Sequence, residues 1–581
     1  MQNGDGSVWI TYNGEVYNHA SFRPALEAKG YRYRSQTDTE SLLFLYEEHG
    51  PELLHQLRGM FAFALWDAKR SRLFLARDRL GIKPLYYTMA GGQLIWASEI
   101  KALLQHPAVV PDLDESALAQ YLTFASVPPP ATLFSGIKKL PPGHYLLAQP
   151  DGTVQIVRWW TPFAANGLYA AESRSFDLAA ERLSALLREA VVEQTMADVP
   201  HGLLLSGGLD STLVLALLTR TLEKPVRTFS IGFDDDTGFD EREFSRAAAR
   251  TYGSDHLELV LQPEEVITSV PELIYAQDEP LSDWVCLPLK ALTKAVRGAG
   301  VIVVQVGEGS DEIFTGYPRY VRYSKVYRRL WRSYARLPAA VRRAGKAGAS
   351  AAIGWIDRLR EVEDLFDRAA RGEPIFVSGA VVNWDLEKTS LVSPALQRRL
   401  GDKLRSGPVA RHFFEEYQHS AARPDILSAM AYQDLAIRLP ELLLMRVDKM
   451  TMLNSVEARV PYLDHRIVEL AFALPPAFKT GGGTSKRVLK HVAEAFVPSE
   501  FIYRRKRGFD VPMSRWLRDE PLKSWSRDTI LGSRLHRREV FNLEAVQGLL
   551  DRHQRGAIDG GFRLWNLINL CAWYDHWVDP A

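Results

Sequence analysis

The 581-residue chain contains only two cysteines, Cys286 and Cys571. Two cysteines do not build a disulfide framework, which fits a reducing compartment. The chain also lacks any apolar run long enough to predict a membrane-spanning helix. Its first residues, MQNGDG, do not have the pattern of a signal peptide. We therefore expect a soluble, cytoplasmic protein that does not bind membranes.

An excess of either charge is also missing. The 71 basic and 70 acidic residues leave a net charge of +1, so the sequence offers no electrostatic reason to expect binding to nucleic acid or to a membrane surface. The hydrophobic content of 46% and the charged content of 24% are ordinary for a globular protein. The chain is too long for one core, so we expect two or more domains.

The most informative motif is SGGLDS at positions 206–211. It follows the apolar run 203–205, which predicts a buried strand, and precedes a helical run at 212–221. Glycines let backbone N–H groups approach phosphate oxygens, and the start of a helix adds partial positive charge. The Gly-Lys-Ser/Thr of a Walker loop does not follow. We therefore predict a phosphate site; the alternative is an ordinary strand-to-helix turn.

Strands and helices alternate along the C-terminal part of the sequence. This order predicts an α/β fold with a doubly wound parallel sheet, in which ligands bind beyond the carboxyl ends of the strands. The motif GEGSDE at 307–312 follows one of these strands and should therefore lie near 206–211. The predicted strands are 202–205, 227–233, 256–261 and 301–306, and the predicted helices are 178–195, 212–222, 241–252 and 264–276.

Two carboxylates, Asp210 and Asp311, should converge at this site from separate strands. Like charges near phosphate repel each other unless a cation lies between them. Mg²⁺, which prefers oxygen ligands, is the natural bridge between carboxylates and pyrophosphate. The alternative is that each aspartate caps a helix, and the two roles are compatible.

Residues 1–160 are predicted to form a layered α+β domain rich in antiparallel strands. Two β-prone runs flank Asn13 and Gly14, which indicates a tight hairpin. TDTE at 37–40 precedes an apolar run that ends at Gly50, which indicates a capping box and a helix with a glycine stop. The remaining strands are predicted at 61–66, 72–77, 85–88 and 94–98. A second domain is predicted over 178–581, after a proline-rich and variable stretch.

Three N-terminal motifs resemble the glutaminase domain of class II glutamine amidotransferases: YNGEVYN at 12–18, TDTE at 37–40 and ARDRLGIKPLYY at 76–87. In that family an N-terminal cysteine attacks the glutamine amide, and backbone and side-chain donors hold the resulting oxyanion. The resemblance implies that the oxyanion is held by Asn13 and Gly14. It also implies that the amino-acid end of glutamine is held by carboxylates, Glu15 and Asp38.

The chain departs from this family at its start. Family sequences begin Met-Cys-Gly-Ile, whereas this one begins MQN, and the family's Arg-Gly-Pro-Asp motif is absent. Neither cysteine lies in a motif that could replace the nucleophile, and covalent glutamine hydrolysis has no first step without one. We expect an incomplete domain, caused by a misassigned start or a truncation, and a chain as given that uses free ammonia.

With SGGLDS and GEGSDE, four further motifs resemble asparagine synthetases of the glutamine-hydrolysing type: LPELLLMRVDKM (439–450), EARVPYLDH (457–465), SKRVLK (485–490) and KRGFDVP (506–512). The resemblance extends from residue 8 over nearly the whole chain. It implies that ATP activates the aspartate side chain as β-aspartyl-AMP and that ammonia then displaces AMP. In the family, ammonia from the N-terminal domain passes through an internal tunnel. The partners implied are ATP, aspartate, glutamine or ammonia, and a second copy in a homodimer.

The resemblance also implies roles for individual residues. Glu308 would support adenylate formation and accept a proton from the attacking ammonium, and Lys486 would stabilise charge near the phosphates. Mg²⁺ would be bound by Asp210 and Asp311. The residues implied to hold ATP and pyrophosphate are Leu205, Ser206, Gly207, Gly208, Asp210, Ser211, Ile231, Val306 and Gly307.

Two other functions stay open at this point. Relatives of these synthetases amidate peptides or secondary metabolites, so the acceptor could be another carboxylic acid. Lactam-forming relatives have a tyrosine in place of Glu308, and the glutamate therefore favours ammonia as nucleophile. The chain could instead bind nucleotide or glutamine without catalysis, but the presence of Asp210, Glu308, Asp311 and Lys486 together argues against that.

Overall fold

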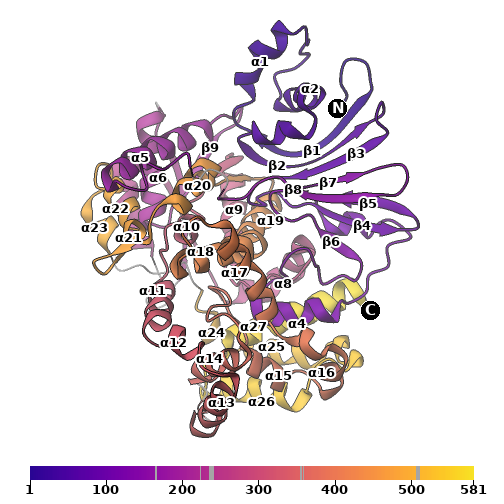
Figure 1. The fold of residues 1–581 in the computed structure, drawn as a ribbon, viewed down its shortest axis with the longest axis vertical. Coiled ribbons are helices and arrows are strands. Elements are labelled where there is room, and N and C mark those ends of the chain that lie inside the picture. The colour runs from indigo at the N-terminus through magenta and orange to yellow at the C-terminus, as the bar shows by residue number, and fades with distance from the viewer. Residues whose placement is uncertain are drawn as a thin grey trace.

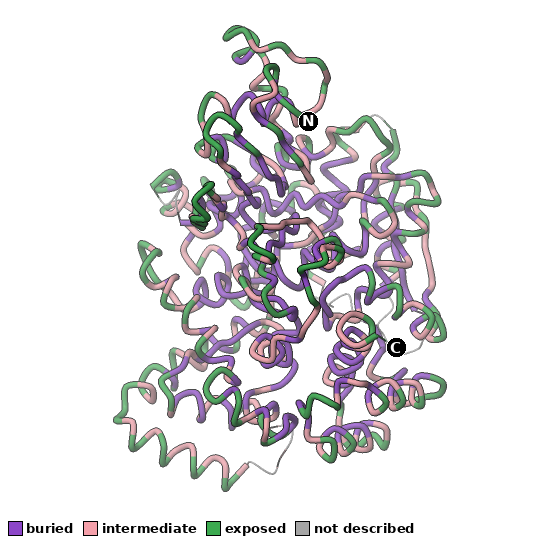
Figure 2. Tube along the Cα trace, turned by 90° about the vertical axis from the view of Figure 1, so that its right-hand side faces the viewer, coloured by how far each residue is buried: buried purple, intermediate pink, exposed green. Residues whose placement is uncertain are grey.

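The computed structural model describes residues 1–163, 167–222, 224–233, 241–353, 356, 359–504 and 511–580. We call residues 1–160 the N-terminal part and the residues from 178 onward the C-terminal part. Figure 1 shows the strands of the N-terminal part stacked at one end of the molecule and the helices of the C-terminal part filling the other end. Buried residues run continuously through both parts, as Figure 2 shows, with exposed residues on the outside.

The N-terminal part is a stack of two antiparallel sheets with helices on one side. Alternate residues of the second strand face opposite ways: Phe61 and Phe63 pack toward the helices, while Ala62 and Ala64 pack toward the other sheet. The first sheet has the order β1(Val8–Val16), β2(Gly59–Asp67), β3(Arg72–Arg77), β7(His144–Ala148), β8(Val154–Arg158), and the second β5(Gln93–Ala97), β4(Tyr86–Ala90), β6(Ile137–Lys139). The helices are α1(His19–Ala28) and α2(Asp38–His49).

The hairpin predicted at Asn13 and Gly14 is wrong. Both residues lie inside the single strand β1, which pairs along its whole length with β2. Glycine at position 14 allows β2 to approach β1 closely and does not form a turn, because a Cβ on Gly14 would lie 2.2 Å from the Met60 carbonyl oxygen. A turn signal flanked by β-prone residues therefore belongs to a continuous strand here, since tertiary pairing outweighs the local preference.

The helix predicted after TDTE is present as α2, and Thr37 is its N-cap residue, accepting a hydrogen bond from the Thr39 backbone N–H. The second half of the predicted capping box is different. The Glu40 carboxylate accepts hydrogen bonds from the backbone N–H groups of Arg34 and Ser35 instead of turning back to Thr37. The acidic residue therefore fixes the preceding loop rather than the cap.

The C-terminal part contains the predicted parallel sheet. Its order is β11(Asp255–Leu261), β10(Arg227–Phe233), β9(His201–Leu204), β12(Val303–Gln305), β13(Glu457–Arg459), and all four pairings are parallel. The chain first adds β10 and β11 on one side of β9 and then β12 and β13 on the other, so the winding reverses after β11 and the switch point lies between β9 and β12. This switch point is where doubly wound folds bind their ligands. The strand β13 was not predicted; it arrives about 150 residues after β12 and closes that edge.

Helices flank this sheet and build the rest of the C-terminal part. Of the two remaining helices of the N-terminal part, α4 packs among them (Figure 1), and the short α3 contacts β4 and β5. The Tyr121 hydroxyl of α4 donates to the Asn566 carbonyl at 3.0 Å. The helices are α3(Ile100–Leu103), α4(Glu115–Phe124), α5(Phe176–Glu193), α6(Leu209–Thr221), α7(Arg242–Tyr252), α8(Glu264–Gln277), α9(Cys286–Gly298), α10(Ser310–Ile313), α11(Pro318–Val326), α12(Arg332–Tyr334), α13(Ala339–Ile353), α14(Arg360–Arg371), α15(Asp385–Leu391), α16(Pro394–Leu400), α17(Gly407–Ser420), α18(Ile426–Ala436), α19(Met445–Met452), α20(His465–Ala473), α21(Pro476–Lys479), α22(Arg487–Ala493), α23(Ser499–Tyr503), α24(Met513–Trp516), α25(Leu522–Leu531), α26(Leu543–Gln554) and α27(Gly561–Trp573).

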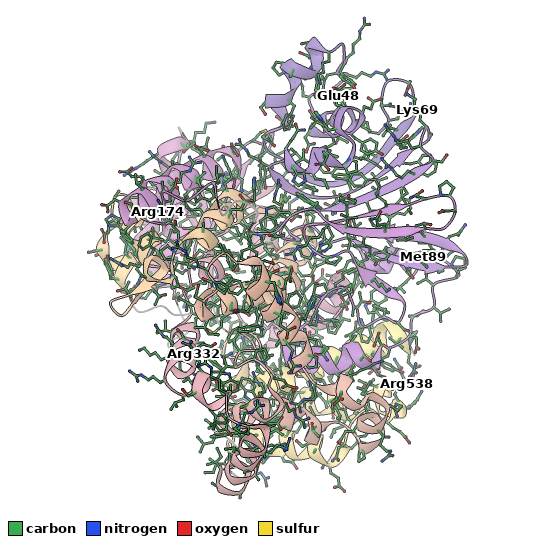
Figure 3. All side chains as sticks on the ribbon, viewed as in Figure 1. Glu48, Lys69, Met89, Arg174, Arg332 and Arg538 are labelled. Atoms are coloured by element: carbon green, nitrogen blue, oxygen red, sulfur yellow. The ribbon has the colours of Figure 1, made fainter. Side chains whose placement is uncertain are left out.

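Charged side chains of both signs cover the outside. Figure 3 shows Glu48 and Lys69 at the end of the molecule formed by the N-terminal part and Arg538 toward the other end. Within the described ranges no helix combines the length and the apolar composition needed to cross a bilayer.

The two parts are joined by buried ion pairs. Lys83 Nζ lies 2.9 Å from Asp448 Oδ1, and both side chains are at most 9% exposed. Lys139 Nζ lies 3.0 Å from Glu279 Oε2 and 2.9 Å from Glu441 Oε2. Although burial acts to lower the pKa of Lys139, the two glutamates outweigh it and raise this pKa. The contact between the parts therefore depends on charges that are removed from water.

We predict that Lys139→Met destabilises the fold strongly, because it leaves Glu279 and Glu441 buried without their shared cation. Removing one partner from a buried pair costs about 3–5 kcal/mol. The midpoint of urea or thermal unfolding should fall accordingly. As a control, Arg537→Met removes the exposed pair with Asp579, where the side chains are 73% and 36% exposed, and should leave the midpoint almost unchanged. Equal shifts in the two variants would contradict the prediction.

Candidate active site

The loop 206–211 connects the carboxyl end of β9 to the start of α6. Gly207 has a φ of +67°, and a Cβ there would lie 2.4 Å from the Phe244 carbonyl carbon, so only glycine fits. The Ser206 and Ser211 hydroxyl oxygens lie 3.1 Å apart, and the Gly208 backbone N–H donates to Ser206 Oγ at 3.3 Å. The helix begins at Leu209 rather than at the predicted Thr212, which brings its N-terminus into the loop.

One lysine joins the two carboxylates that were expected to converge. Lys486 Nζ lies 2.7 Å from Asp210 Oδ2 and 2.6 Å from Asp311 Oδ1, and it donates to Ser310 Oγ at 2.7 Å. Burial acts to lower the pKa of Lys486, but the two aspartates outweigh it and raise this pKa. The side chains of Asp210, Asp311 and Lys486 thus form one cluster, with a cation already between the carboxylates.

The helix-capping alternative does not describe these aspartates. The N-cap residues of α6 and α10 are Gly208 and Gly309, and Asp210 and Asp311 lie in the first turns that follow. Acidic groups in a first turn interact favourably with the helix dipole, but their side chains here meet Lys486. The structure therefore brings both carboxylates to a shared point beside the 206–211 loop.

Glu308 lies at the same edge of the sheet, just after β12, with its side chain 30% exposed. Its Oε1 accepts a hydrogen bond of 2.6 Å from Arg446 of α19. Arg446 in turn donates to Asp283 Oδ2 at 2.6 Å. Sequence reasoning did not assign roles to Arg446 or Asp283. Arg446 lies within the motif 439–450, which is the signal that could have pointed to it.

The apolar residues predicted at the site lie at the carboxyl ends of adjacent strands. Leu205, Ile231 and Val306 are buried, with exposed fractions of 2%, 6% and 4%. The Val306 backbone N–H donates to the Arg459 carbonyl at 2.9 Å, which ties this strand end to β13. A Cβ on Gly307 would lie 3.1 Å from the Ser211 nitrogen, so the 206–211 loop and the 307–312 loop are in contact.

The four residues expected to bind glutamine lie together in the N-terminal part. Asp38 accepts hydrogen bonds from the Tyr12 hydroxyl at 2.6 Å and from the Val16 backbone N–H at 2.9 Å, which places it against β1. Glu15 lies on the same strand, and burial together with the Asp38 charge raises its pKa to about 7. Asn13 donates to Ser98 Oγ at 3.1 Å, while Gly14 lies between Asn13 and Glu15 in the strand.

The glutamine-site residues also touch the C-terminal part. Arg459 of β13 lies 3.4 Å from Glu15 Oε2 and packs over the ring of Tyr17. A cavity of about 20 Å³ lies at this junction, which is room for about one water-sized molecule. Its lining comes from both parts and includes Tyr17, Asp78, Leu463 and His465.

Both cysteines belong to the C-terminal part, whereas the residues expected to bind glutamine belong to the N-terminal part. Cys286 and Cys571 are buried in α9 and α27 of the C-terminal part. Burial raises the pKa of Cys571 to about 12 and also raises that of Cys286, so both thiols stay protonated.

The carboxylates of Asp210 and Asp311 fit a magnesium ion that binds together with phosphate. Among the described residues there is no cluster of three or more His, Cys, Asp or Glu side chains that could enclose a metal by themselves. Asp210 and Asp311 supply hard oxygen donors from two loops, and Mg²⁺ typically combines one or two carboxylates with phosphate oxygens and waters. The motif KRGFDVP cannot be placed, because 505–510 lie outside the described residues.

Comparison with known proteins decides the family. Residues 182–575 match the asparagine synthase family, and residues 1–160 match the glutamine amidotransferase domain. The chain belongs to the asparagine synthase family. The resemblance and the α/β fold expected from the sequence are thereby confirmed, and the chain is a carbon–nitrogen ligase of the glutamine-hydrolysing class.

Full-length similarity supports this assignment. The chain is 31% identical to asparagine synthetase [glutamine-hydrolyzing] 1 of Bacillus subtilis, over 98% of this chain and 86% of that protein. It is 32% identical to a putative asparagine synthetase [glutamine-hydrolyzing] of Mycobacterium tuberculosis, over 98% of this chain and 85% of that protein. It is also 29% identical to the amidase chyE of Penicillium rubens, over 88% of this chain and 78% of that protein.

We predict that Gly207→Ala prevents the 206–211 loop from keeping its shape, because the added Cβ would collide with the backbone of Phe244. ATP binding, measured by calorimetry, should weaken by at least tenfold. A matched control is Gly548→Ala in α26, where a Cβ meets nothing within 4 Å. Unchanged ATP binding in Gly207→Ala would show that this loop does not contact the nucleotide.

Proposed function

We propose that the chain amidates aspartate to asparagine with ATP, through β-aspartyl-AMP, and releases AMP and pyrophosphate. The observation that carries the proposal is the cluster of Lys486 with Asp210 and Asp311 at the switch point of the parallel sheet, with Glu308 beside it. Anionic phosphates need this combination of a glycine loop, a helix start and a buried cation.

In the first step an oxygen of the aspartate side-chain carboxylate attacks the α-phosphorus of ATP. The bond from that phosphorus to the bridging oxygen breaks, and pyrophosphate leaves. We assign pyrophosphate to the loop 206–211 and to Lys486, whose ammonium group offsets the developing negative charge. Leu205, Ile231 and Val306 would flank the adenosine as a buried apolar surface. Mg²⁺, which Asp210 and Asp311 would hold, supplies further charge neutralisation on the phosphates when bound.

In the second step the nitrogen of ammonia bonds to the carbonyl carbon of the adenylate, and the carbon–oxygen bond to AMP breaks. The nitrogen must lose a proton as the amide forms. Glu308 is the partly exposed carboxylate at this edge, and we assign it that proton. A well-placed base of this kind contributes about 10²–10⁴-fold to the rate.

We propose ammonia as the nitrogen source for the 581-residue chain. Its two thiols are buried in the C-terminal part and protonated, so neither attacks a glutamine amide. Asn13, Gly14 and Glu15 are neighbours on β1, and Asp38 lies against the same strand, which supports glutamine binding at this end of β1. A homodimer, as in the family, is part of the proposal.

A second acceptor class is favoured by one observation, the similarity to a protein named as an amidase. In that case the same loop, the same lysine and the same glutamate would activate and amidate a different carboxylic acid. The distinguishing experiment supplies ATP, Mg²⁺ and ammonium with aspartate or with other acids and measures AMP and amide. Asparagine formed with ammonium supports the main proposal, and AMP formed only with another acid supports the second.

We predict that Glu308→Gln lowers kcat for asparagine formation with ammonium by at least about 100-fold, because the amide side chain does not accept the proton. The assay follows asparagine and AMP together. The matched control is Glu52→Gln, a side chain that is 78% exposed in the N-terminal part. Near-normal asparagine and pyrophosphate formation by Glu308→Gln would remove Glu308 from the reaction.

A further inference from the structure

The position of Glu308 is not determined by its own segment. It lies between Gly307 and Gly309, and Gly309 has a φ of +89°. Both glycines are closely packed, Gly307 against Ser211 and Gly309 against Leu463, but this packing places the backbone and not the direction of the Glu308 side chain. Misplacing a reacting group by about 1 Å can cost about 10²-fold in rate. A contact from another part of the fold must therefore orient the Glu308 carboxylate.

We propose that Arg446 is the positioning residue of Glu308 and that the N-terminal part holds Arg446 in place through helix α19. This inference rests on the proposed role of Glu308. Arg446 donates from one terminal nitrogen to Glu308 Oε1 and from the other to Asp283 Oδ2, each at 2.6 Å. The Arg446 side chain is 9% exposed, so the interaction with Glu308 is shielded from solvent on the arginine side.

Asp283 fixes the direction of the guanidinium. Its second oxygen, Oδ1, accepts a hydrogen bond of 3.0 Å from the Val285 backbone N–H, just before α9. Arg446 is therefore held at one end by a carboxylate that is itself anchored to backbone, and it presents its other nitrogen to Glu308. A planar guanidinium can span two acceptors in this way, and a lysine ammonium on its flexible stem holds them less rigidly.

Helix α19 connects Arg446, and with it the contacts to Asp283 and Glu308, to the N-terminal part. Asp448, two residues beyond Arg446, forms the buried ion pair with Lys83. Lys449 Nζ lies 2.8 Å from Asp278 Oδ2, and the same oxygen accepts from the Ile100 backbone N–H at 3.0 Å. Within one turn, the helix thus carries Arg446, which orients Glu308, and the two charged groups Asp448 and Lys449, which link it to the N-terminal part.

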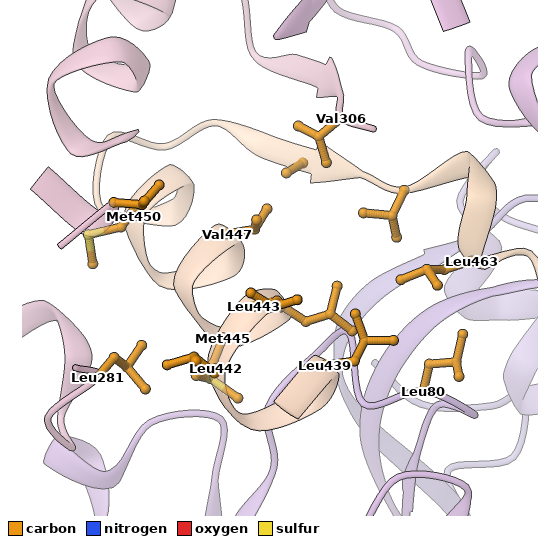
Figure 4. Packing of buried hydrophobic residues seen from close by; sticks show 14 of the residues in the cluster. Leu80, Leu281, Val306, Leu439, Leu442, Leu443, Met445, Val447, Met450 and Leu463 are labelled. Atoms are coloured by element: carbon orange, nitrogen blue, oxygen red, sulfur yellow. The ribbon is translucent and has the colours of Figure 1, made fainter. Parts of the chain in front are cut away.

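The apolar side of α19 has little freedom to move. Val447 and Met450 are buried, in one cluster with Leu80 of the N-terminal part and Val306 at the strand end (Figure 4). A π-helical turn, Leu439–Leu444, leads into α19, and such turns are frequent at functional sites. Because α19 is a single short helix, a displacement at Asp448 is transmitted to Arg446. The N-terminal part therefore supports amidation even when ammonia is supplied directly.

The experiment uses ammonium as the only nitrogen donor and measures kcat and the KM values for ATP and ammonium in the full chain. Arg446→Met should lower kcat about 100-fold, while the KM for ATP changes by less than about twofold. Arg446→Lys should have a kcat about tenfold higher than that of Arg446→Met. Lys83→Met, which removes the ion pair with Asp448 and leaves Arg446 and Glu308 in place, should lower kcat by about tenfold, again with less than about a twofold change in the KM for ATP.

The matched control is Arg58→Met. It removes another ion pair between the two parts, with Glu193 at 2.6 Å, but does not involve α19, and it should keep kcat within about twofold. Circular dichroism and ATP binding show whether each variant is folded. If Arg446→Met keeps kcat, if Arg446→Lys is no better than Arg446→Met, or if Lys83→Met and Arg58→Met behave alike, the inference is overturned. If the unmodified chain amidates no acid, the proposed function itself is overturned.

Discussion

Buried ion pairs hold the N-terminal and C-terminal parts in one relative placement. Lys83 and Lys139 extend from the N-terminal part and find their carboxylate partners on helices and loops of the C-terminal part. An unpaired charge in these positions would be far more costly than an unpaired apolar group, so the pairs allow few relative placements of the two parts. Asp448 and Arg446 lie on the same helix, α19. The contact between the two parts therefore also affects the position of Glu308 in the candidate active site.

The active site itself is a concentration of charge that needs compensation. Asp210, Glu308 and Asp311 gather where two strands end, close to where we place phosphates. Lys486 and Arg446 supply the positive charge, and each is held by two carboxylates. Such a cluster is stable because every charged group has a partner of opposite sign at hydrogen-bond distance. A nucleotide that binds here would exchange some of these ion pairs for contacts with its phosphates, because the charged side chains already have partners.

Much of this arrangement could be predicted from the sequence. The alternation of strands and helices predicted the parallel sheet, and the position of SGGLDS and GEGSDE after strands predicted that Asp210 and Asp311 would meet. Local preference failed at Asn13 and Gly14, where pairing with β2 keeps the chain extended. Local preference also gave no sign of β13, because its three residues are too few for a pattern and it joins the sheet only by pairing with β12.

The fold class, the order of the elements and the segments that carry the chemistry follow from the amino-acid sequence, because they depend on hydrophobic period and on glycine and acidic residues at fixed spacings. The pairing of charges follows from the packing of elements that are distant in the chain. Arg446 meets Glu308 and Asp283, and Lys83 meets Asp448, over separations of 138 to 365 residues. The sign of a charge is visible in a sequence, but its partner is chosen by which helices and strands pack together.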